Sequence, residues 1–86
     1  MTTAPRPATV PQVSAWICAY LQAHPRAADT PEGIQRWWLA SQHGEVTLQL
    51  VEMALAELEQ NGMVQKLDPS ALRPAYGRGP ALGAGG

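Results

Sequence analysis

The sequence predicts a mainly α-helical domain with a small β-hairpin, and three observations lead to this fold class. Two stretches, 11–24 and 47–61, repeat apolar residues at the spacing of one helical face. A third stretch opens at Thr30 with residues that favour a helix start. Residues 63–67 then alternate apolar and polar side chains, as a strand does.

The chain of 86 residues has room for one small domain. We expect residues 10–76 to fold, between a disordered N-terminal tail (1–9) and a disordered C-terminal tail (77–86) that holds five of the eight glycines. The formal net charge of −1 gives no general attraction to nucleic acid or to acidic membranes. We also expect no signal peptide and no membrane-spanning segment.

The only cysteine, Cys18, excludes an intrachain disulfide and a cysteine-based metal cluster. A reducing, cytoplasmic location is therefore the expectation.

The first helix is predicted over 11–24. Pro11 suits the first turn, where its missing N–H group would have no partner, and Pro25 disfavours helical geometry at His24. One face carries Val13, Trp16, Ile17, Tyr20, Leu21 and His24.

The second helix is predicted to start at Thr30 as the N-cap, with Pro31 and Glu32 in the first turn, and to stop at Gly44. Regular α-helical geometry places Ile34, Trp37, Trp38 and Ser41 on one face. It directs Leu39 nearly the opposite way.

The third helix is the most regular. Thr47 is the predicted N-cap, and Asn61-Gly62 is the predicted end, with Gly62 in the left-handed conformation. The apolar stripe is Leu48, Val51, Ala54, Leu55 and Leu58. The opposite, outer face is Gln49, Met53, Ala56, Glu57 and Gln60.

A hairpin is predicted after this helix. Residues 63–67 form its first strand, residues 68–70 turn, and residues 73–76 return as a second strand. Pro74 cannot donate a ladder hydrogen bond, so the returning strand is expected at a sheet edge.

This order of elements resembles a three-helix winged helix-turn-helix domain. The resemblance is carried by IxxYL at 17–21, DTPEGI at 29–34 and VTLQLVEMALAELEQNGMV at 46–64. In DNA-binding members of that family, the helix that matches residues 47–61 enters the major groove and the hairpin, or wing, touches the DNA backbone. The resemblance thus implies a DNA-reading helix at 47–61 and a wing at 63–76.

Charge argues against that function. The 47–61 helix carries Glu52, Glu57 and Glu59 and no Lys or Arg, whereas DNA affinity depends mainly on cations at phosphates. The link at 41–46 is also longer than the usual turn of the motif. We therefore expect a protein-contact module, as an adaptor, an accessory subunit or a homodimer. Its candidate contact residues are Trp38, Leu39, Gln49, Leu50, Met53, Ala56 and Gln60.

The alternative is a DNA-binding transcriptional regulator. Glutamine pairs well with adenine, and four cations could position a weak binder on the backbone. The candidate DNA contacts are Arg36, Gln49, Gln60, Lys66, Arg73 and Arg78.

Trp37 and Trp38 also admit two interpretations. Because the sequence has no Phe, at least one of the two indoles is expected to fill the core. The second interpretation is that the small core leaves the other ring on the surface, where an apolar patch would favour a partner.

No enzymatic function is predicted. His24 and His43 are isolated, with no second ligand at metal spacing, and His24 is expected to close the first helix in a partly buried position. No nucleophile elbow or phosphate-binding loop is present in the sequence. We expect no metal, no cofactor and no small-molecule substrate.

Overall fold

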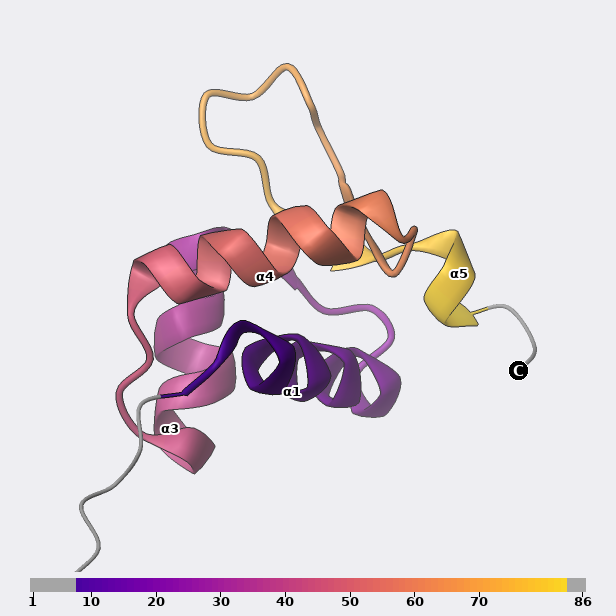
Figure 1. Cartoon of the computed structure of the whole chain (residues 1–86). Helices are drawn as coiled ribbons and strands as arrows, with labels where there is room; N and C mark the ends of the chain where they lie inside the picture. Colours follow the sequence, from indigo (N-terminus) through magenta and orange to yellow (C-terminus); the bar gives the residue numbers. More distant parts are fainter. Residues whose placement is uncertain (1–7, 84–86) are drawn as a thin grey trace, which may run out of the picture.

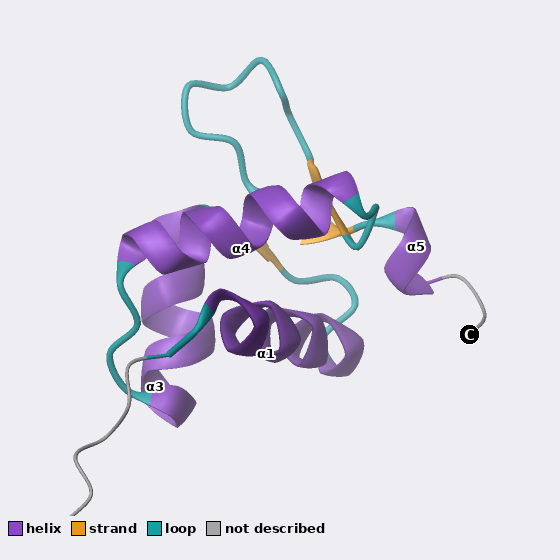
Figure 2. Ribbon diagram, in the orientation of Figure 1, coloured by secondary structure: helices purple, strands orange, loops and turns teal. Residues whose placement is uncertain are grey.

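A computed structural model describes residues 8–83 of the chain (Figure 1). The elements are α1 (Val10–Ala23), β1 (Ala28–Asp29), α2 (Pro31–Gly33), the π-helix η1 (Ile34–Leu39), α3 (Ala40–His43), α4 (Leu48–Gln60), β2 (Val64–Lys66), β3 (Tyr76–Arg78) and α5 (Pro80–Gly83). Helices dominate and the strands are short (Figure 2). The predicted fold class, mainly α with a little β structure, is confirmed at that level.

The helices α1 and α4 pack against each other, and the continuous helix formed by α2, η1 and α3 runs beside α1 with its α2 end behind α4 (Figure 1). Their shared core is apolar throughout. It consists of Val13, Ile17, Leu21, Ile34, Trp38, Leu39, Val46, Val51, Ala54, Leu55, Leu58 and Val64.

Helix α1 begins at Val10, one residue earlier than predicted, and Thr9 is its N-cap. The Thr9 hydroxyl accepts a hydrogen bond from the Gln12 backbone N–H, and the Gln12 side chain accepts one from the Thr9 N–H, which forms a capping box. The helix ends before Pro25, as predicted, with His24 as its C-cap. His24 is exposed, however, and not partly buried as expected.

The predicted cap of the second helix is confirmed, since the Thr30 hydroxyl accepts from the Gly33 N–H. Beyond this cap, the predicted assignment of side chains to the faces of the helix is wrong. Residues 34–39 form a π-helix, in which the Ala40 N–H bonds the Gln35 carbonyl five residues back. This wider turn carries Leu39 into the core and leaves Trp37 66% exposed.

Helix α4 agrees with its prediction at both ends. The Thr47 hydroxyl accepts from the Leu50 N–H. At the other end, Met63 N–H bonds the Leu58 carbonyl and Gly62 N–H bonds the Glu59 carbonyl, with Gly62 at φ 75°. This is a Schellman motif, and it needs a left-handed residue at Gly62.

The sheet differs from the predicted hairpin in two respects. Its strand order is β1-β3-β2, all antiparallel, so β3 is central and not an edge strand. The return strand is also Tyr76–Arg78 and not 73–76, because Pro74 lies in the connecting loop. Strand β1, which was not predicted, pairs Ala28 with Gly77.

The ordered part of the chain extends past the predicted boundary at residue 76. Gly77 and Arg78 belong to β3, and residues 80–83 form α5. The backbone N–H of Ala81 donates to the Gly62 carbonyl at 2.9 Å, which ties α5 to the end of α4. Residues 1–7 and 84–86 of the two predicted tails lie outside the described part.

Candidate functional site

The uncharged residues of the predicted outer face of α4, Gln49, Met53, Ala56 and Gln60, are open to solvent, and the name outer face is kept for these four below. All four side chains are exposed, as predicted, and Met53 is 50% exposed. The Thr47 cap and the buried Val51, Ala54, Leu55 and Leu58 fix this orientation, because each turn of the helix must keep its apolar stripe on the core. The result is a helix face with an exposed thioether between two amides.

Carboxylates flank this outer face. Glu52, Glu57 and Glu59 are exposed on α4, and the helix has no Lys or Arg. A polyphosphate brought to this helix would meet three like charges and find no cation on the helix itself.

The cations expected to contact DNA come from different elements, and two of them face carboxylates. Lys66 Nζ lies 4.0 Å from Glu59 Oε1, and Arg73 Nη1 lies 3.9 Å from Glu32 Oε1. Both pairs are exposed, so they add little to stability, but they lower the positive potential around the β2–β3 loop (residues 67–75). Arg36 is on η1 and Arg78 is on β3.

Two predicted protein-contact residues are wrong. Trp38 is 4% exposed and Leu39 is fully buried, so neither can touch a partner. The expectation that at least one indole of the pair fills the core is confirmed by Trp38. The exposed indole is Trp37, whereas the sequence placed Trp38 among the contact residues, because no local signal indicates a π-helix.

Trp38 belongs to a row of stacked rings along α1. Its indole stacks on Tyr20 with centroids 4.5 Å apart, and Tyr20 in turn contacts the ring of His24. Trp16 stacks on His43, with centroids 3.9 Å apart and planes 5° from parallel. The Trp16–His43 contact packs α3 against α1. Each of the two histidines thus packs on an aromatic ring.

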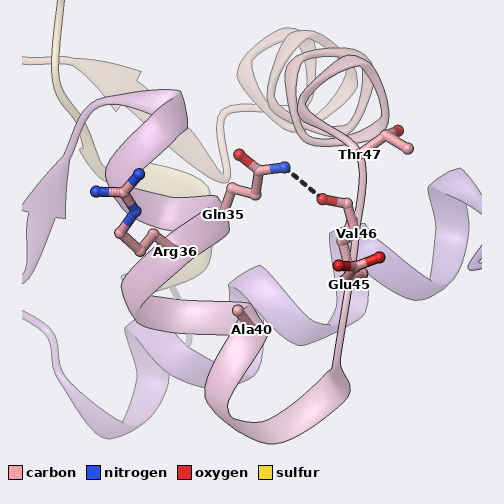
Figure 3. Close-up of a pocket in the computed structure, with 6 residues that line it drawn as sticks. All are labelled: Gln35, Arg36, Ala40, Glu45, Val46 and Thr47. Atoms are coloured by element: carbon pink, nitrogen blue, oxygen red, sulfur yellow. Dashed lines mark hydrogen bonds between the residues drawn. The ribbon is translucent and has the colours of Figure 1, made fainter.

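A shallow hollow of about 370 Å³ separates η1 from the loop before α4 (Figure 3). Gln35, Arg36 and Ala40 line one side, and residues 45–47 line the other. Gln35 Nε2 donates to the Val46 carbonyl at 2.6 Å, so this side chain fixes the loop that starts α4. Its charged residues, Arg36 and Glu45, come from opposite sides and form no ion pair within the described residues, so we assign the hollow a structural role.

A second groove, of about 190 Å³, lies between the β2–β3 loop and the helices α2 and α4. We call it the loop groove; it is lined by Pro31, Glu32, Glu52, Leu72, Arg73, Pro74 and Tyr76. Its lining mixes four apolar or aromatic residues with three charged ones, of which two are acidic. Leu72 is 98% exposed at its rim.

The described residues offer surfaces for contact with a partner and few reactive side chains grouped for catalysis. Within residues 8–83, no three His, Cys, Asp or Glu side chains are grouped closely enough to hold a metal ion. Cys18 is half-buried, and its burial raises the pKa of the thiol, which makes it a poorer nucleophile.

No protein-family model, curated protein or solved structure matches this chain. Its function must therefore be argued from its own surfaces. Among the described helices, none is long and apolar enough to cross a lipid bilayer.

Proposed function

We propose that this chain is a non-enzymatic winged-helix module that binds another polypeptide through the outer face of α4. The sequential arrangement of three helical segments followed by a β2–β3 hairpin supports the winged-helix part of the proposal. Its role is that of an adaptor, an accessory subunit or a self-associating protein. The lone cysteine supports a reducing, cytoplasmic location.

One observation favours a polypeptide partner over DNA. The helix that would enter the major groove exposes Met53 among glutamines and carboxylates and has no cation. Thioether side chains are enriched at protein interfaces, because they adapt to irregular partner surfaces. Nucleic-acid readers instead anchor themselves with Lys and Arg at phosphates.

The test compares the wild-type chain with Met53→Glu as immobilised baits in extracts of the source cells. Bound proteins are quantified by mass spectrometry, and Arg78→Glu serves as a control that changes charge away from α4. We expect at least one stoichiometric partner that Met53→Glu loses and Arg78→Glu keeps. Partners retained equally by all three baits would contradict a role for the outer face.

A DNA-binding regulator is the second candidate, favoured by the exposure of Gln49 and Gln60 on the outer face. It predicts binding to duplex DNA that weakens steeply between about 50 and 200 mM salt, through counterion release. Gln49→Ala should then weaken binding in a sequence-dependent way. We expect no such binding, and a steep salt dependence would favour the regulator over the adaptor.

A further inference from the structure

We propose that two copies of this chain form a reversible dimer in which Trp37 of each copy enters the loop groove of the other. The proposal rests on the proposed protein-binding function, since it specifies one partner as the chain itself. It uses a surface other than the outer face of α4. The surface is the solvent side of the continuous helix α2–η1 together with the β2–β3 loop.

Trp37 is an exposed aromatic residue on the solvent side of η1. Its side chain is 66% exposed, although an indole carries a large apolar area and a single hydrogen-bond donor. Exposed tryptophans are enriched among the residues that dominate binding energy at interfaces. The π-helix turns Trp38 and Leu39 into the core and leaves the ring of Trp37 on the surface. Trp37 is therefore exposed because its two neighbours are buried.

The loop groove has room for such a ring. Pro31, Leu72, Pro74 and Tyr76 offer contacts for an aromatic ring beside the charged residues of the groove, and its volume is about 190 Å³. Leu72, at its rim, is 98% exposed and thus also lacks a packing partner among residues 8–83.

Charge complementarity identifies the occupant. Arg36 precedes Trp37 and is exposed, while Glu32 and Glu52 line the groove. Glu52 forms no ion pair with any residue of the described part, and Glu32 meets only Arg73, at 3.9 Å. A second copy therefore brings an arginine beside the tryptophan to a groove that has unneutralised acidic charge.

The register follows from the helix itself. Glu32 and Arg36 are four residues apart, so two antiparallel copies of this helix can place each Glu32 opposite the Arg36 of its partner. The same register sets Trp37 opposite Pro31, at the mouth of the groove. Such an interface is isologous, because each surface is used twice. It is too small for an obligate dimer, so we expect reversible association.

Sedimentation velocity of the full chain tests this from about 1 µM to about 1 mM, the range in which weak interfaces dissociate. The wild type should shift from monomer to dimer as concentration rises. Trp37→Ser should raise the dissociation constant by roughly thirtyfold, the effect of removing a dominant contact. Its thermal unfolding midpoint should stay near that of the wild type, because Trp37 is exposed.

Charge exchange tests the register. Arg36→Glu and Glu32→Arg should each weaken the dimer at least tenfold, and the double variant should recover most of the wild-type affinity. Two controls, Arg78→Glu and Met53→Ala, should leave the dimer unchanged. A wild type that stays monomeric, a Trp37→Ser variant that dimerises normally, or a double variant that fails to recover would each overturn the proposal.

These outcomes are separable from those of the proposed function. If the wild type stays monomeric but Met53→Glu still loses its partner, the dimer is refuted and the outer face of α4 remains the binding surface. A dimer sensitive to Met53→Ala would place the contact on α4 and so overturn the Trp37 interface.

Discussion

Ile34 and Leu39 lie five residues apart on one helix, and both side chains are fully buried. A regular α-helix would point them in different directions, but the i→i+5 hydrogen bond of η1 aligns them. The same wide turn brings Trp38 onto Tyr20, with ring centroids 4.5 Å apart, and leaves Trp37 outside. The π-helix thereby decides which indole of the pair meets solvent.

This arrangement predicts opposite effects for two neighbouring substitutions. Leu39→Ala should lower the free energy of unfolding by about 2–5 kcal/mol, because it leaves a cavity in the core. Trp37→Ala should change it by less than about 0.5 kcal/mol, since the ring is exposed. Urea denaturation followed by circular dichroism measures both. A larger loss for Trp37→Ala would mean that residues 34–39 follow regular α-helical phase.

The two faces of α4 predict a second contrast. Met53→Glu should leave the free energy of unfolding within about 0.5 kcal/mol of the wild type, because the position faces water. Leu55→Ala, two residues along, should cost about 2–5 kcal/mol, which a domain of this size can barely tolerate. Equilibrium denaturation gives the values. Unfolding of Met53→Glu would refute the assigned face.

The attachment of α5 predicts a local effect of Gly79→Ala. Gly79 N–H donates to the Met63 carbonyl at 2.8 Å, and a Cβ at this position would collide with the backbone oxygen of Gly62. Because backbone cannot yield as a flexible side chain does, the variant should lose about 1–3 kcal/mol. The Ala81 amide should also lose its protection from hydrogen exchange.

Gly77→Ala is the matched control for that substitution. A Cβ at Gly77 would meet the end of the Leu67 side chain at 3.4 Å, which is an ordinary contact. Its Ala81 amide should therefore remain protected. Equal protection in both variants would show that α5 does not depend on the close approach of Gly79 to Gly62.

The partly buried thiol of Cys18 predicts that the stability of the fold depends on pH. Burial raises the pKa of its thiol, so the folded chain holds the proton more tightly than the unfolded chain does. The resulting contribution to stability is present below the unfolded pKa and is lost as pH rises through the folded pKa. Alkylation by iodoacetamide at mildly alkaline pH should be slower in the native chain than in urea. Equal rates would show that the thiolate is not disfavoured in the fold.

The local elements could be predicted because their signals are short in range. Thr30 and Thr47 cap their helices through hydrogen bonds to residues three positions away, and Gly62 ends α4 through its own positive φ. The apolar stripe of α4 follows from its 3.6-residue period. The sequence alone determines these features, and it also determines the exposed Met53 and its flanking carboxylates.

Only the tertiary structure decided the rest. Burial of Leu39 and exposure of Trp37 depend on a π-helix that core packing selects, since local propensity does not favour it. Strand β1 is two residues long and exists because Gly77, far along the chain, supplies its partner. Glycine-rich sequence after residue 76 predicted disorder, but inter-strand pairing and the contact with Gly62 order it through residue 83, because hydrogen bonds between distant segments outweigh weak local preference.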